Sequence, residues 1–161
     1  MSGPAPRGAR PLAALLLAGA LATGCTGDES ADEGGAEPAV GPRLAVSDAY
    51  IPEPVNAEVA GGFLVLRNEG DADDELVGVS SELTETVEIH QTVDNAMRQV
   101  DGLPVPAGGT LRLERGGDHL MFLDLREPIA EGDTVSVELR FATSAPLTVE
   151  VPVEAATHTG E

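Results

Sequence analysis

The chain has 161 residues, enough for one domain, and its 19 glycines, 12 prolines and single tyrosine, with no tryptophan, favour strands and turns around an aliphatic core. All 28 acidic residues follow Cys25, together with seven of the nine arginines, and the chain has no lysine. The part after Cys25 therefore has a formal net charge of −21. Such a surface repels phosphate groups, which excludes nucleic acid and anionic lipid headgroups as partners, and it attracts cations, although the same acids can serve only to keep a domain soluble.

Residues 1–24 have the layout of a secretory signal peptide. Arg7 and Arg10 give a basic start, and residues 12–21 form an apolar run too short to span a bilayer stably. The run leads into Ala-Thr-Gly-Cys, which resembles the bacterial lipobox, whose cysteine receives diacylglycerol. The alternative is an ordinary signal peptide and a chance cysteine. Because Cys25 is the only cysteine, we predict lipidation there and an extracytoplasmic protein anchored to the bacterial cell membrane by lipid alone.

Residues 25–42 and 154–161 are predicted to lie outside the folded domain. The first segment holds the lipidated cysteine and then small and acidic residues, which cannot bury enough apolar surface to fold, so it is predicted to be a flexible tether. The second is predicted to be a disordered tail, and its His158 is interpreted as incidental.

Residues 43–153 are predicted to form the folded domain. Short alternating runs recur between turn residues, with turns expected at 68–74, 101–109 and 127–133, and no segment has a sustained helical period. This spacing predicts an all-β fold, an antiparallel β-sandwich or barrel. The nine expected strands are 43–50, 61–68, 74–81, 85–92, 96–100, 110–116, 119–125, 134–141 and 147–153.

Two histidines and two methionines gather in one part of this domain. Apart from Met1 and His158, the chain has no other residues of these types, and all four fall within 32 residues: His90, Met97, His119 and Met121. His119 and Met121 share a strand face, because side chains two apart point the same way. Each residue alone has an ordinary explanation, a core methionine or a surface histidine, but their coincidence indicates a metal site. Asp118 either orients the ring of His119 or is a solvated turn residue, and we favour the second interpretation.

The donor set is selective for one kind of ion. Thioether sulfur is soft and uncharged, and two thioethers with two imidazoles suit Cu(I). A structural zinc site favours thiolates or more histidines, and a blue-copper site requires a cysteine thiolate that this domain lacks.

The segment from Val46 to Val153 resembles the periplasmic copper chaperone (PCu(A)C) family, which is linked to assembly of the CuA centre of cytochrome c oxidase. The resemblance rests on GGFLVLRNEGDADDELVGVSS, on VEIHQTV, and on VPAGGTLRLERGGDHLMFLDLREPIAEGDTV with its His-x-Met pair. It implies a cupredoxin-like β-sandwich with His90, Met97, His119 and Met121 as Cu(I) ligands.

The sequence departs from the family pattern at three places. Twenty-one residues separate Met97 from His119, as in the family, but only six separate His90 from Met97, about four fewer than usual. A shorter hairpin can move Met97 relative to the other three ligands. Gln91 stands where a methionine sometimes follows the first histidine, and Tyr50 stands where members often have tryptophan.

These features together predict a monomeric Cu(I) chaperone that delivers copper to an apo-cuproprotein. The resemblance implies cytochrome c oxidase subunit II as this recipient and another copper chaperone as a possible second partner. Two alternatives stay open: a copper-buffering or storage lipoprotein, and a β-sandwich interaction module without metal. An enzyme is not expected, because the sequence contains no nucleophile–base set and no cofactor motif.

Overall fold

The computed structural model describes residues 41–94 and 96–160. The expected signal peptide, the lipidated Cys25 and the tether as far as residue 40 lie outside the described residues, so they remain predictions. Within the described ranges, no helix has the length and apolar character needed to cross a membrane.

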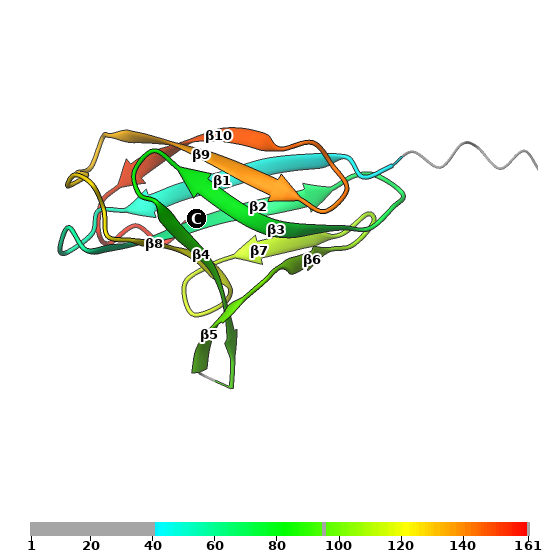
Figure 1. Ribbon diagram of the computed structural model, residues 1–161, viewed down its shortest axis with the longest axis horizontal. Coiled ribbons are helices and arrows are strands. Elements are labelled where there is room, and N and C mark those ends of the chain that lie inside the picture. The colour runs from blue at the N-terminus through cyan, green and yellow to red at the C-terminus, as the bar shows by residue number, and fades with distance from the viewer. Residues whose placement is uncertain (1–40, 95, 161) are drawn as a thin grey trace, which may run out of the picture. The chain divides into compact units, whose positions relative to one another are not determined.

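Ten strands make up the described part of the chain, which contains no helix (Figure 1). All nine predicted strands are present, with ends that shift by a few residues. The strands are β1 (Leu44–Pro52), β2 (Val59–Asn68), β3 (Asp74–Ser81), β4 (Thr86–Val93), β5 (Ala96–Val100), β6 (Leu103–Val105), β7 (Thr110–Leu113), β8 (His119–Leu123), β9 (Thr134–Phe141) and β10 (Leu147–Glu154).

The strands follow one another in the order β5-β4-β8-β2-β1-β10-β9-β3-β6, and β7 pairs with β2. This sheet folds over, so that β10, β9, β3 and β6 form one layer opposite β2 and its neighbours (Figure 1). The prediction of an all-β fold is confirmed. The pairing is mixed, because β1 and β10 run parallel whereas all other strand pairs are antiparallel, so the expected antiparallel arrangement is corrected at this one pair. No turn joins these two strands, so no hairpin fixes their direction.

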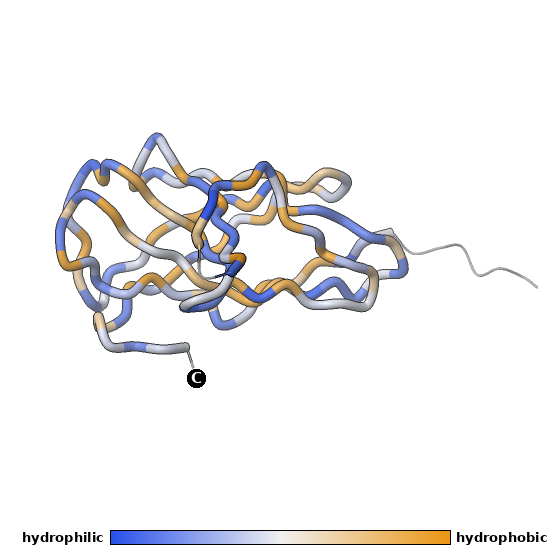
Figure 2. The backbone as a smooth tube through the Cα atoms, turned by 90° about the horizontal axis from the view of Figure 1, so that it is seen from below, coloured by the Kyte–Doolittle hydropathy of each residue, from blue (hydrophilic) through white to orange (hydrophobic). Residues whose placement is uncertain are grey.

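The space between the layers is filled mainly by aliphatic side chains, as the composition indicates, together with Phe122 and Phe141. Along β9, for example, buried residues alternate with exposed or half-buried ones, and Figure 2 shows hydrophobic and hydrophilic positions following one another along the tube. The fully buried large side chains include Phe122, Leu66, Leu76, Leu120 and Leu139. On β8, Leu120 and Phe122 face this core, which leaves His119 and Met121 on the opposite, outer face.

Strand β6 corrects one prediction. Residues 101–109 were expected to form a loop, but Leu103–Val105 pair with β3 as a short edge strand. Pro104 has no backbone N–H to donate, so a strand that contains it can lie only at the edge of the sheet. The side chain of Pro104 is exposed. Leu103 and Val105 are both buried, and this burial explains why the segment joins the sheet.

Candidate metal centre

The two histidines of the predicted site face each other across neighbouring strands. His90 on β4 and His119 on β8 are direct partners in the antiparallel register, and their ring centroids are 5.5 Å apart. Direct partners point to the same side of a sheet. Both rings therefore lie on the outer face. His119 is only 8% exposed, and the side chain of His90 is 15% exposed.

The same row continues across the sheet as a line of aromatic rings. Phe63 on β2 lies 6.4 Å from His119, and Tyr50 on β1 lies 5.2 Å from Phe63, measured between ring centroids. Tyr50 reaches this row because β1 has a β-bulge between Ser47 and Tyr50, where Asp48 has a φ of 51°. The rings form an apolar wall on one side of the histidine pair.

Met121 lies beside the histidine pair. It is two residues beyond His119 on the same face of β8, opposite Glu88 of β4 and Gly61 of β2. A Cβ on Gly61 would lie 3.3 Å from the ring of Phe63, so the absence of a side chain lets this ring lie over the strand next to Met121. The predicted common face of His119 and Met121 is thus present.

Met97 occupies a more peripheral position than the other three residues. It faces Thr92 on β4, so it shares the face of His90 and lies one diagonal step away, ~7–8 Å on an ideal sheet. It is 64% exposed, on the β4–β5 hairpin whose far end projects from the domain (Figure 1). The hairpin is short because Val93 pairs with Ala96, and Asp94, directly after Val93, has a φ of 52°.

The ring of His119 is oriented by a backbone carbonyl. Its Nδ1 lies 3.0 Å from the carbonyl oxygen of Gly117, which also accepts a hydrogen bond of 2.8 Å from the Thr92 hydroxyl. Asp118, considered from the sequence as a partner of this ring, instead accepts from the backbone N–H of Thr92 at 3.3 Å. The less favoured interpretation of Asp118 as the orienting residue is therefore wrong, and the favoured one, a solvated turn residue, holds only in part, because Asp118 is half-buried and hydrogen-bonded to Thr92.

Sequence reasoning missed Glu88 as a contact of the site. Its carboxylate oxygen lies 2.7 Å from Nε2 of His90, and its side chain is 24% exposed. The other ring nitrogen of His90, Nδ1, is buried without a hydrogen-bond partner. A Glu-x-His pair on one strand was the available signal, because residues two apart share a face.

The C-terminal segment also differs from expectation. Residues 154–161 were predicted to be a disordered tail, but Glu154 is the last residue of β10, and His158 packs edge-on against Tyr50, with ring centroids 4.7 Å apart. Arg115 lies over the ring of Phe63 and donates a hydrogen bond to the carbonyl of Ala156 at 3.1 Å. The rings of Tyr50 and Phe63 offer an apolar surface that the segment covers, and they separate His158 from His119.

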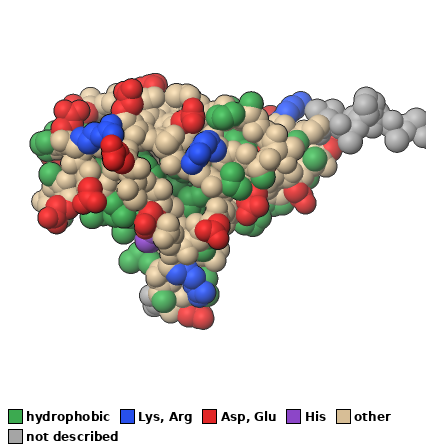
Figure 3. All heavy atoms as spheres, viewed as in Figure 1, with side chains coloured by type: hydrophobic (Ala, Val, Ile, Leu, Met, Phe, Trp, Pro, Cys, Tyr) green, Lys and Arg blue, Asp and Glu red, His purple; other side chains and the backbone are tan. Residues whose placement is uncertain are grey.

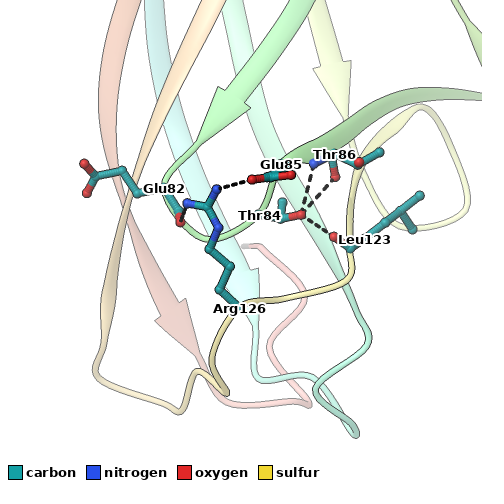
Figure 4. Close-up of polar contacts among 6 residues, drawn as sticks. All are labelled: Glu82, Thr84, Glu85, Thr86, Leu123 and Arg126. Atoms are coloured by element: carbon teal, nitrogen blue, oxygen red, sulfur yellow. Dashed lines mark hydrogen bonds and ion pairs between the residues drawn. The ribbon is translucent and has the colours of Figure 1, made fainter.

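The turn between β3 and β4 fixes where β4 meets β8 (Figure 4). Thr84 is buried; its hydroxyl bonds to the carbonyl of Leu123 at the end of β8 and accepts from the N–H of Thr86 at 3.1 Å. Arg126 binds the same turn from outside, through the carbonyl of Glu82 at 3.1 Å and the carboxylate of Glu85 at 3.0 Å. Thr86 then pairs with Leu123, and the register carries His90 to His119.

The site as a whole offers two imidazoles and nearby thioethers. Within residues 41–94 and 96–160, no group of three or more His, Cys, Asp or Glu residues is arranged to hold a metal ion. The Nδ1 atom of His90 is buried and has no hydrogen-bond partner among the described residues. A buried polar atom without a partner is unusual in a folded protein, and it fits a site for an ion.

Comparison with known proteins agrees with this fold. Residues 44–153 match the family described as "Putative lipoprotein LpqE-like". The "Putative lipoprotein Lxx21020" of Leifsonia xyli subsp. xyli (strain CTCB07) is 31% identical over 114 residues, 68% of each chain.

Two solved structures are also similar. The apo PmoF2 PCuAC domain has a TM-score of 0.66 at 22% identity, with 76% of this chain and 98% of that domain covered. CuI-DR1885 from Deinococcus radiodurans has a TM-score of 0.60 at 27% identity, with 81% and 89% covered. These neighbours confirm the predicted resemblance to PCuAC domains, and the match over residues 44–153 shows that the chain belongs to the LpqE-like family of lipoproteins.

Proposed function

We propose that this protein is an extracytoplasmic, lipid-anchored Cu(I) chaperone. The observation that carries the proposal is the cross-strand pair of His90 and His119 with Met121 beside it, on a domain whose fold is that of PCuAC domains. The similar protein from Deinococcus radiodurans has a solved Cu(I) form, which supports the choice of ion.

The proposed ligands are His90, His119, Met121 and Met97. They are uncharged nitrogen and soft sulfur donors, a set that favours Cu(I) over zinc, calcium or magnesium. The rings of Phe63 and Tyr50 shield one side of the pair from water. Met97 is the most exposed of the four proposed ligands, so it is the ligand that a recipient can replace first. Copper then moves to the partner by stepwise ligand exchange.

Anaerobic titration with Cu(I) against a chromophoric chelator tests the binding site. We expect the wild type to bind one Cu(I) and the His119→Ala, Met121→Ala double variant to lose this binding. His158→Ala is the matched control, since His158 is separated from the site by two rings, and it should bind as the wild type does. Equal binding by the double variant and the wild type would refute the site.

A transfer assay separates a chaperone from a copper buffer, the second candidate function. Cu(I)-loaded protein is mixed with an apo CuA domain of oxidase subunit II, and copper on the recipient is measured after the two are separated. The chaperone proposal requires net transfer, whereas copper that stays with the donor favours buffering. The proposed anchor is tested by mass spectrometry of the membrane fraction, where Cys25→Ala should abolish a lipid-modified N-terminus.

A further inference from the structure

Glu88 and His90 make the shortest polar contact between side chains of the site. They lie two residues apart on β4 and point to the same face, and Oε2 of Glu88 is 2.7 Å from Nε2 of His90. Both side chains are largely buried, so water competes little for either atom. A hydrogen bond to a charged carboxylate in such surroundings is stronger than one between neutral groups.

This contact selects the tautomer of His90. An ionised carboxylate can only accept, so the Nε2 atom of the ring carries the proton that it donates to Glu88. In the neutral ring the lone pair is then on Nδ1. This is the atom that is buried and has no hydrogen-bond partner among the described residues.

His119 has the opposite arrangement. Its Nδ1 faces the carbonyl oxygen of Gly117 at 3.0 Å, and a carbonyl also can only accept. The proton of the neutral ring is therefore on Nδ1, and the lone pair is on Nε2. Each ring is held by an acceptor on one nitrogen, and a metal-binding histidine usually has such a second contact.

The carboxylate of Glu88 also brings charge to the site. Glu88 is the direct cross-strand partner of Met121, so it lies within the row that carries the proposed sulfur ligand. The four proposed ligands are neutral, and a Cu(I) ion among them leaves a net positive charge. Carboxylate oxygen is a poor ligand for soft Cu(I), so Glu88 acts through His90 and through its charge.

We propose that Glu88 is a positioning residue that fixes the tautomer of His90, so that copper is bound by Nδ1 of His90 and Nε2 of His119. This inference rests on the proposed function for the identity of the ion, but the tautomers themselves belong to the copper-free protein.

Long-range ¹H–¹⁵N NMR of the copper-free protein at about pH 8 tests the tautomers directly. The expected result is a proton on Nε2 of His90 and on Nδ1 of His119. Addition of one equivalent of Cu(I) under anaerobic conditions should shift the ¹⁵N signals of the other two nitrogens. A proton on Nδ1 of copper-free His90, or a copper shift at its Nε2, overturns the inference.

Variants of Glu88 test its part in binding. Glu88→Ala removes the acceptor, so His90 should become a mixture of tautomers and the affinity for Cu(I) should fall about 10- to 100-fold, the range for loss of such a contact. Glu88→Gln keeps a carbonyl acceptor without the charge and should recover part of this loss. Glu138→Ala is the control, because it removes one acidic side chain from the exposed face of β9.

The two possible failures can be told apart. A wild type that binds no Cu(I) refutes the proposed function, and the NMR signals of the copper-free protein still report whether Glu88 sets the tautomer of His90. A wild type that binds Cu(I) no more tightly than Glu88→Ala, with Glu138→Ala unchanged, refutes the role of Glu88 alone.

Discussion

The two methionines of the proposed site differ in their surroundings. Met121 is partly buried between Glu88 and Gly61, whereas Met97 is 64% exposed on a projecting hairpin. Binding of copper by an exposed thioether also restricts the motion of its side chain and strand. This loss of conformational entropy reduces the free energy that the sulfur–copper contact contributes to binding. The two residues should therefore contribute unequally to affinity.

Substitution by leucine tests this difference, because leucine keeps the volume and removes the sulfur. Met121→Leu should weaken Cu(I) binding at least about tenfold, or ~1.4 kcal/mol, and Met97→Leu by less than about threefold. Met97→Leu should instead change the rate at which a chelator removes copper. Competition titrations and stopped-flow measurements check both statements, and an equal loss of affinity in the two variants would contradict them.

Asp74 is the buried acidic residue whose environment sets a pH dependence of stability. Burial raises the pKa of its carboxyl, but hydrogen bonds from the Ser144 side chain and from the backbone N–H groups of Glu75, Thr143 and Ser144 outweigh burial and lower this pKa below its ordinary 3.8. The carboxyl thus joins the start of β3 to the β9–β10 loop.

A lowered folded-state pKa means that the carboxylate stabilises the fold above pH 3.8, and that this contribution is lost as the pH falls through the folded-state value. Asp74→Asn should lower the free energy of unfolding by about 1–3 kcal/mol at neutral pH, and the difference from wild type should shrink in acid. Urea unfolding at several pH values measures it. Asp71→Asn, an exposed neighbour, is the control and should have little effect at any pH.

At the residue scale, some of the site follows from local rules and some does not. The common face of His119 and Met121 follows from the period of a strand. The pairing of His90 with His119 depends on the register between β4 and β8, two strands that are separated by β5, β6 and β7 in the chain. The contacts of Glu88 and Gly117 depend on rotamers and turn geometry, which spacing alone does not determine.

At the scale of elements, the β3–β4 turn determines how β4 meets β8. Its buried Thr84 satisfies the carbonyl of Leu123 and the N–H of Thr86, whereas the ion pair between Arg126 and Glu85 is exposed to water. Buried hydrogen bonds contribute more to stability than exposed ion pairs do, because their partners cannot turn to water when a bond is lost.

Thr84→Val keeps the shape of the side chain and leaves both partners unsatisfied, so the free energy of unfolding should fall by about 1–3 kcal/mol. Glu85→Ala removes only the exposed ion pair and should cost less than ~1 kcal/mol. Chemical denaturation of both variants gives the comparison. A larger loss for Glu85→Ala would mean that the outer contact holds the turn.

Elements with strong alternation were the easiest to predict from sequence. Strands β3, β5 and β9 have the bounds that were expected, because turn residues border a period-two pattern. Strand β6 was missed because its proline suggested a loop, although Leu103 and Val105 are buried. The parallel pairing of β1 with β10 is a long-range feature that no local pattern encodes.

At the scale of the whole molecule, the proposed ligands are four uncharged side chains in a strongly acidic protein. Figure 3 shows acidic side chains distributed over the visible face with few basic ones among them. The core is aliphatic and the described part of the chain has no cysteine, so no disulfide supports it there. Copper that binds only the folded state should consequently stabilise the domain by mass action.

Cu(I) at about 100 times its dissociation constant adds ~2.7 kcal/mol to the free energy of unfolding, which should raise Tm by roughly 10 °C in a domain of this size. The His119→Ala, Met121→Ala variant should show no such shift. Anaerobic thermal scans with and without Cu(I) provide the measurement, and Ag(I), which does not oxidise in air, serves as a substitute ion. A similar shift in the variant would mean that the ion binds elsewhere.

Strand β1 connects the start of the described chain with the row of aromatic rings beside the proposed site. Its first residue, Leu44, follows the start of the described chain, and the row of rings begins at Tyr50, six residues further along. At ~3.3 Å per residue the two points are about 20 Å apart. The start of the described chain therefore lies away from the histidine pair, so the segment by which the chain enters the domain leaves the proposed copper site uncovered.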